Sequence, residues 1–169
     1  GVEPFDVLAL HSAEALFAGD QALLSVPGSL AQKQRRKILA AIRREREERR
    51  KRQDSIANLL EPNLKFGAGG LRDIEQALAL KNLFPETFSP GDDYPFEVLS
   101  QIKEEFLFLR ALLHLMGSGD VLSAHDQLEI TKKLGMESAP ILMKFVQREL
   151  ERASFYADWA VANCASCAA

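Results

Sequence analysis

Six apolar residues near the middle of this 169-residue chain recur at steps of 3, 4, 3, 4 and 3 positions. They are Leu99, Ile102, Phe106, Leu109, Leu113 and Met116. This spacing places them on one face of an α-helix, and its seven-residue repeat suits packing along antiparallel neighbouring helices. A glycine-rich triplet, residues 117–119, follows directly and ends the pattern. The stretch therefore predicts a long helix that is buried along one face inside a helical bundle.

Helical spacing also dominates the rest of the chain. The expected helices occupy residues 4–19, 20–26, 29–55, 71–84, 99–116, 123–135 and 138–160. Ser29 and Ser123 stand where N-caps are expected, and Pro140 fits the first turn of the last helix. Few stretches alternate with a period of two, and none is bounded by hairpin signals. The predicted fold class is all-α, a bundle of about six or seven helices that includes one long basic helix.

Length and composition indicate one globular domain. Apolar residues make up 47% of the chain and charged residues 27%, so it can bury a core. Within residues 1–169 we expect N-terminal helices over 1–56, a glycine-rich motif loop over 57–73, a helical bundle over 74–163 and a tail over 164–169. No apolar run could cross a bilayer and no signal peptide opens the chain, so we expect no membrane association and a cytoplasmic location. Cys164 and Cys167 are expected to be thiols of a frayed end.

The basic residues are concentrated in one segment. Residues 33–52 hold 11 of the 21 lysines and arginines and only 3 acids. Three pairs there have the favourable spacing for ion pairs along a helix, namely Glu45/Arg49, Glu47/Lys51 and Glu48/Arg52. The segment is either a solvated helix that projects from the body or a basic arm for a nucleotide, a nucleic acid or an acidic partner. No aromatic residue lies among the arginines, which disfavours nucleic-acid binding.

A glycine cluster lies in the stretch 61–74, which reads EPNLKFGAGGLRDI. Gly67, Gly69 and Gly70 fall within four positions between Lys65 and Arg72. A helix that begins after such a loop presents free N–H groups, which with two cationic side chains would suit a phosphate or a carboxylate. The same pattern also fits a tight connection in which Asp73 only compensates the helix dipole. The stretch lacks the G-K-[ST] ending of a phosphate loop and no strand precedes it, so both readings stay open.

Asn63-Leu64-Lys65 followed by residues 67–74 resembles the signature of bacterial protein-PII uridylyltransferases and glutamine-synthetase adenylyltransferases. Weaker matching pieces lie at residues 16–20, 106–107, 110, 113–114, 126–127, 130 and 134–135. The likeness runs from about residue 8 to about residue 136, and only the glycine motif is specific. Three departures from the pattern are Phe66, Ala68 and a short turn over 117–121.

The resemblance implies a helical domain that follows the nucleotidyltransferase domain and positions nucleotide or protein substrate against it. The residues implied are Lys65, Gly67, Gly69, Gly70, Arg72 and Asp73. Nucleotidyl transfer needs carboxylates on a sheet to hold Mg²⁺ against the triphosphate, and Gly28-Ser29 leads instead into a helix with no acidic pair. We therefore expect no catalytic residue, metal site or cofactor in this chain, which alone should be inactive. His125-Asp126 matches a metal-phosphohydrolase dipeptide, but its further ligands are missing.

For the full-length protein the resemblance implies Mg²⁺ with UTP or ATP. Its implied partners are the catalytic domain of the same polypeptide and a protein substrate such as a PII-like protein or glutamine synthetase. The residues leave open whether UMP or AMP is transferred. The alternative is a helical regulatory or protein-interaction module of a signalling protein that uses its arginine-rich helix to bind an acidic partner. A G-S-x-n-D-x-D segment upstream would decide for the transferase.

Overall fold

The computed structural model describes residues 28–53 and 56–166. Within them the α-helices are α2 (Gly28–Gln53), α3 (Ile56–Leu60), α4 (Leu71–Leu83), α5 (Asp93–Leu115), α6 (Ala124–Lys133) and α7 (Ala139–Ser166), and the 3-10 helix η1 spans Pro85–Thr87. The described part contains no strand, only an isolated antiparallel bridge between Asn63 and Val121. The all-α prediction is confirmed. The two helices expected before residue 28, and Cys167, lie outside the described residues. Cys164 is fully buried within α7, so the expectation that it is a thiol of a frayed end is wrong.

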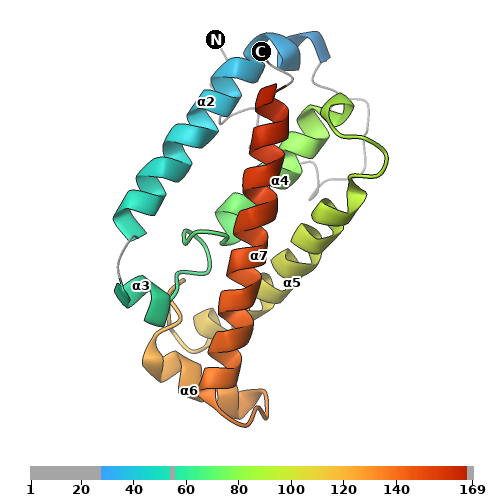
Figure 1. Ribbon diagram of the computed structural model, residues 1–169. Coiled ribbons are helices and arrows are strands. Elements are labelled where there is room, and N and C mark those ends of the chain that lie inside the picture. Colours follow the sequence, from blue (N-terminus) through green and yellow to red (C-terminus); the bar gives the residue numbers. More distant parts are fainter. Residues whose placement is uncertain (1–27, 54–55, 167–169) are drawn as a thin grey trace.

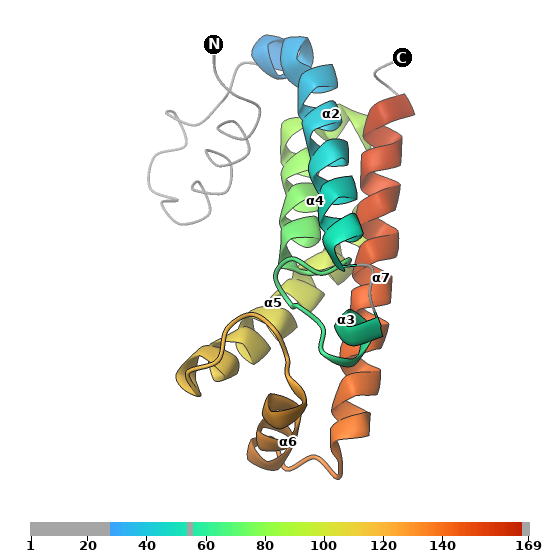
Figure 2. The ribbon, with the colours of Figure 1, turned by 90° about the vertical axis from the view of Figure 1, so that its left-hand side faces the viewer.

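Helix α7 is the axis of the molecule. It runs the length of the bundle in both views, with α2 and α4 beside it, while the C-terminal half of α5 leans away towards α6 (Figures 1 and 2). Ser123 caps α6 as expected, since its side chain accepts a hydrogen bond from the backbone of Asp126. By contrast, α2 begins at Gly28 and thus already includes Ser29, the expected cap.

Two groups of buried side chains form the core. The larger lies among α4, α5, α6 and α7 and includes Leu64 and Leu122 from the loops between helices. The smaller joins the middle of α2, through Ile38, Leu39 and Ile42, to the ends of α4 and α7. The part of α2 that follows Ile42 contributes no apolar side chain to either group, so polar contacts must hold it in place.

The seven-residue pattern of α5 is its buried face. The side chains from Leu99 to Leu113 in that pattern are at most 3% exposed, while Met116 is half-buried. The prediction of a long helix buried along this face is confirmed. The burial follows from the pattern because neighbouring helices pack against this face and remove it from water.

Leu109→Ala tests the contribution of this face. We expect it to lower the free energy of unfolding by about 3 kcal/mol, because deleting a buried leucine loses transfer free energy and leaves a cavity. The adjacent Phe108→Ala is the matched control, since Phe108 is 53% exposed. Urea unfolding followed by circular dichroism measures both. Equally small decreases in the free energy of unfolding of the two variants would mean that the pattern does not face the core.

Candidate functional site

The motif loop, residues 61–70, folds around Asn63. The Asn63 side chain accepts hydrogen bonds from the backbone N–H groups of Lys65 and Phe66, at 3.0 and 2.8 Å. Its carbonyl accepts a third from Gly67, at 2.9 Å. An asparagine that bonds the backbone two and three residues ahead closes a tight turn. The loop therefore has a defined shape before the glycine cluster begins.

The first N–H groups of α4 are already used. Three of them donate to carbonyls of the motif loop at 2.9–3.0 Å. The donor and acceptor pairs are Leu71 to Leu64, Arg72 to Lys65 and Asp73 to Gly70. The expectation of free N–H groups at this helix start is therefore wrong, because the loop folds back over the end of the helix and satisfies them. An anion could be held here only by side chains.

The glycines let the motif loop touch the backbone of α7. Gly69 is buried and has a φ of +73°. A Cβ atom at Gly69 would lie 1.9 Å from the carbonyl oxygen of Leu150, and one at Gly70 would lie 2.8 Å from that of Leu64. Only glycine leaves room for such approaches. Packing therefore requires glycine at these two positions, while their role in positioning a substrate stays a prediction.

Asp73 is the centre of a buried ionic network. Its side chain is 1% exposed, and one oxygen accepts a hydrogen bond from the Gly69 N–H at 2.9 Å. The other carboxylate oxygen lies 2.6 Å from an Arg49 nitrogen and 3.4 Å from Arg46. Asp73 therefore does more than compensate the dipole of α4. It joins the motif loop to the second half of α2.

Three arginines of α2 face the bundle. Arg46, only 5% exposed, donates to the carbonyl of Ala157 on α7 at 3.2 Å, and it forms an ion pair with Asp158 at 2.9 Å. Arg50 bonds both oxygens of the same carboxylate. The interpretation of this segment as a helix projecting from the body is wrong, because Arg46, Arg49 and Arg50 fix it to α4 and α7. Arg43, Arg44, Lys51 and Arg52 remain exposed.

The network shifts the pKa values of its arginines. Burial lowers the pKa of Arg46, although the carboxylates of Asp73 and Asp158 oppose the shift. Burial acts in the same direction at Arg49, but Asp73 and Glu45 outweigh it and raise its pKa. Arginine stays charged in both cases, so Asp73 lies among permanent cations.

The two cationic side chains of the motif remain accessible. Arg72 is 37% exposed and lies 3.7 Å from the Glu45 carboxylate, which also accepts a hydrogen bond from Gln76 at 2.7 Å. The Lys65 ammonium lies 4.8 Å from the centre of the Phe66 ring. Among the predicted site residues, Lys65 and Arg72 are the ones whose charged groups could reach a ligand. Sequence reasoning missed Glu45, Arg46, Arg49 and Gln76 as partners of the motif.

A second polar cluster fixes the motif loop to α5. Asp120 accepts hydrogen bonds from Arg110 at 2.5 Å and from His114 at 3.1 Å, and its carbonyl accepts one from the Leu64 N–H at 2.9 Å. Burial alone would raise the pKa of Asp120, but the bonds from Arg110 and His114, together with the charges of Arg110 and Lys65, outweigh it and lower the pKa. This cluster gives Arg110 and His114, part of the resemblance noted above, a shared function in positioning the loop.

Acid should weaken this attachment. A carboxylate whose pKa is lower in the folded state stabilises the fold fully above its ordinary pKa, and that contribution disappears as the pH falls through the folded-state value. Asp120→Asn should therefore be less stable than the parent at neutral pH, and the difference should shrink as the pH falls below the ordinary value of 3.8. Urea midpoints across this range measure it. Asp93→Asn, in an exposed pair with Lys81, is the control; a constant difference for Asp120→Asn would contradict the prediction.

Asp126 has a structural role. Its carboxylate accepts hydrogen bonds from Ser118 at 2.7 Å and Ser123 at 2.5 Å, where it supports the start of α6. Burial would raise the pKa of Asp126, and these bonds outweigh it and lower the pKa. Within residues 28–53 and 56–166, no three His, Cys, Asp or Glu side chains are grouped to hold a metal ion. In the same part of the chain, no helix combines the length and apolarity needed to cross a membrane.

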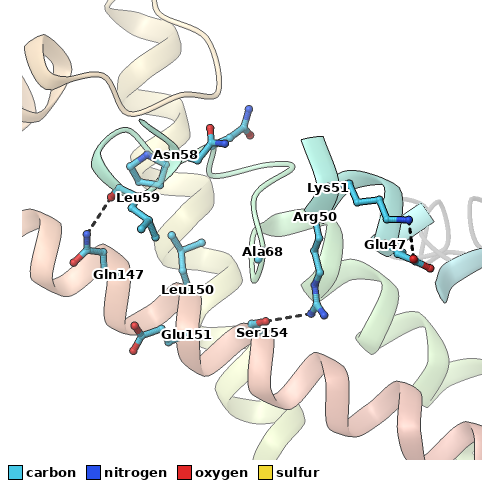
Figure 3. A pocket seen from close by; sticks show the side chains of 12 residues that line it. Glu47, Arg50, Lys51, Asn58, Leu59, Ala68, Gln147, Leu150, Glu151 and Ser154 are labelled. Carbon is cyan, nitrogen blue, oxygen red and sulfur yellow. Dashed lines mark hydrogen bonds and ion pairs between the residues drawn. The ribbon is translucent and has the colours of Figure 1, made fainter. Parts of the chain in front are cut away.

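A groove of about 810 Å³ lies beside the motif loop, between α2, α3 and α7. Its apolar lining comes from Leu59, Pro62, Ala68 and Leu150, and its polar lining from Glu47, Arg50, Lys51, Asn58, Asn63, Gln147, Glu151 and Ser154. Figure 3 shows the loop carrying Ala68 where it passes between α2 and α7. The volume is within the range of small-molecule sites. The motif thus forms one wall of a concave surface.

Known proteins match this chain over its described bundle. The sequence profile of the family described as GlnD PII-uridylyltransferase matches residues 36–156. A bifunctional uridylyltransferase/uridylyl-removing enzyme of Streptomyces coelicolor is 33% identical over 113 residues, which cover 66% of this chain and 13% of the relative. The enzyme of the same description from Caulobacter vibrioides is 30% identical over 125 residues, with the same coverage. No solved structure matches.

The chain spans 13% of the length of these curated relatives. The matched region contains the motif loop, Asp73 with Arg46 and Arg49, and the Asp120 cluster, while Asp158 lies just beyond it. The chain belongs to the GlnD PII-uridylyltransferase family.

Proposed function

We propose that this chain is the non-catalytic helical domain of a PII-uridylyltransferase-like protein, in which it positions nucleotide or protein substrate against a catalytic domain of the same polypeptide. The observation that carries the proposal is the family match over the glycine motif and the bundle that holds it. The curated relatives are named uridylyltransferases, which favours UMP over AMP as the transferred group. The description of the matched family names PII, which favours a PII-like protein over glutamine synthetase as the acceptor.

Mg²⁺ does not fit the three carboxylates that surround the motif loop and the start of α6 in the described part of the chain. Asp73 is already bonded to two arginines, Asp120 to Arg110, and Asp126 to two serines. A Mg²⁺ site needs open oxygen ligands, usually one or two carboxylates that also face the substrate phosphates. We therefore assign the metal and the chemical step to the catalytic domain.

The buried and the exposed residues of the motif have different roles. Gly67, Gly69, Gly70 and Asp73 are buried and fix the path of the loop. Lys65 and Arg72 are partly exposed, so their charged groups can meet phosphate oxygens or a carboxylate of the catalytic domain. The buried residues hold the two cations in place, and the cations make the contact.

The alternative of an interaction module built on the arginine-rich helix has less support. It needs the arginines of α2 to be available to an acidic partner. Arg46 and Arg49 instead neutralise Asp73, and Arg50 bonds Asp158. The three arginines that face the bundle are therefore already paired, and this alternative would have to rest on exposed cations such as Arg43, Arg44 and Arg52.

Lys65→Ala and Arg72→Ala test the proposal in the full-length polypeptide. Each should lower UMP transfer to a PII-like acceptor by at least about tenfold, because each removes a charge that acts in the transition state. Labelled UTP with Mg²⁺ gives the rate, and thermal unfolding confirms that the variants stay folded. Lys133→Ala, at an exposed lysine of α6, is the matched control.

The isolated chain is the negative control of this assay and should transfer no labelled UMP. Full activity in both variants would reduce the motif to a structural connection. Stoichiometric labelling by the isolated chain would instead place catalytic groups inside the bundle and overturn the proposal.

A further inference from the structure

The C-terminal half of α5 is apolar on both sides. Residues 106–115 read FLFLRALLHL, and only the arginine and the histidine are polar. Phe106, Leu109 and Leu113 are buried in the core. An apolar stripe remains on the other side, formed by Leu107, Phe108, Ala111 and Leu115. A helix that is hydrophobic all round is normally buried all round.

The apolar stripe is exposed within the described part of the chain. The exposed fraction is 37% for Leu107, 53% for Phe108 and 84% for Leu115. Figure 2 shows why, since this half of α5 leans away from α2, α4 and α7. Exposed apolar side chains that adjoin one another are a feature of interaction surfaces, whereas scattered ones are not.

The stripe borders the candidate site. Arg110 and His114 lie on the same helix beside it, and both bond Asp120, which also holds Leu64 of the motif loop. The charge of Lys65 acts on the same carboxylate. A body seated on the stripe would therefore lie close to one of the two accessible cations of the motif.

We propose that the apolar stripe is the surface on which the catalytic domain of the same polypeptide packs, through an apolar surface of its own. The inference rests on the proposed function and adds the place of contact. The matched region includes the stripe, and the matched relatives are far longer than this chain, so further domains are available to cover it.

The small size of the stripe favours a tethered partner. Ten helical residues span only about 15 Å, so the stripe is much smaller than the surface that a stable dimer buries, roughly 1,200–2,000 Å² in total. A domain linked to this chain is present at an effective concentration near the millimolar range, so a small apolar contact suffices. The stripe also carries no charge, which argues against an acidic or basic partner.

Cysteine accessibility tests the inference. Leu115→Cys is placed in a Cys164→Ala, Cys167→Ser background, and the rate of maleimide labelling is measured in the isolated chain and in the full-length polypeptide. We expect labelling at position 115 to be at least about tenfold slower in the full-length polypeptide, because a covered thiol is shielded from the reagent. Ala162→Cys, at an exposed position of α7, is the matched control and should label equally in both. If Leu115→Cys does not fold, Phe108→Cys replaces it.

Each other outcome overturns the inference. Equal labelling in the two proteins would mean that the stripe stays free. Slow labelling already in the isolated chain would assign the stripe either to a second copy or to another segment of this chain, such as the apolar residues between Phe5 and Phe17. Sedimentation of the isolated chain and of Leu115→Glu separates those two cases. Labelling does not depend on UMP transfer, so failure of this contact and failure of the proposed function are distinguishable.

Discussion

Gly69→Ala is expected to lower the free energy of unfolding by about 5 kcal/mol. The left-handed conformation at φ +73° costs an alanine about 1–2 kcal/mol. The added Cβ would also lie 1.9 Å from the carbonyl oxygen of Leu150 and 2.9 Å from the backbone nitrogen of Ser154. These are backbone atoms of α7, which cannot rotate away as a side chain can. Overpacking costs about 1–3 kcal/mol in ordinary cores and more where nothing can yield.

Gly117→Ala is the matched control for Gly69→Ala. Gly117 has a similar φ, +79°, but a Cβ there would meet nothing within 4 Å. The control should therefore show only the conformational cost of about 1–2 kcal/mol. Urea unfolding of the isolated chain, followed by circular dichroism, measures both variants. Equal losses at the two positions would show that the motif loop does not press on α7.

The helical fold could be predicted from the sequence because its signal is local. The spacing of apolar residues from Leu99 to Met116 reports which face of a helix leaves water, and this depends only on neighbours along the chain. The same holds for the cap at Ser123, since its partner Asp126 lies three residues ahead. The short helix α3 was missed because its five residues, Ile56–Leu60, are too few to show a period.

The attachment of α2 could not be predicted in the same way. Residues 43–55 contain no apolar side chain, and that pattern normally indicates a solvated helix. The partners of Arg46 and Arg49 are in α4 and α7, far along the chain, so no local spacing reveals them. Only one hint was present, namely that Arg46, Arg49 and Arg50 stand at i, i+3 and i+4 and so share one face of the helix.

The glycines locate the candidate site in the sequence, but the sequence predicts the chemistry of that site only in part. Glycine clusters suit both a phosphate cradle and a close approach of two backbones, and composition cannot separate the two. To distinguish these two cases one needs the position of the α7 backbone. The α7 residues that contact the motif lie about eighty positions later in the sequence. The structure supplies that position and shows that carbonyls of the loop accept hydrogen bonds from the first N–H groups of α4. What remains for a ligand is the pair of side chains, Lys65 and Arg72.

The second large effect is expected at Asp73. Asp73→Ala should lower the free energy of unfolding by about 5 kcal/mol, because it removes the carboxylate shared by Arg46, Arg49 and the Gly69 N–H. Breaking a buried ion pair by deleting one partner costs about 3–5 kcal/mol, since the other charge stays buried without compensation. Here two arginines lose that partner, and a buried N–H loses its acceptor at a further cost of about 1–3 kcal/mol. Asp158 still neutralises Arg46 in part and Glu45 still pairs with Arg49, which keeps the total near the upper end of the single-pair range.

Two variants make the Asp73 prediction specific. Asp93→Ala removes the acceptor of an exposed ion pair with Lys81, 2.7 Å long, and should cost no more than about 1 kcal/mol. Asp73→Asn keeps an acceptor for the Gly69 N–H but removes the charge, so its loss should fall between those of Asp93→Ala and Asp73→Ala. Urea midpoints of the isolated chain measure all three. If Asp73→Ala were no more harmful than Asp93→Ala, the network would be a surface contact, and the second half of α2 would be held by something other than this carboxylate.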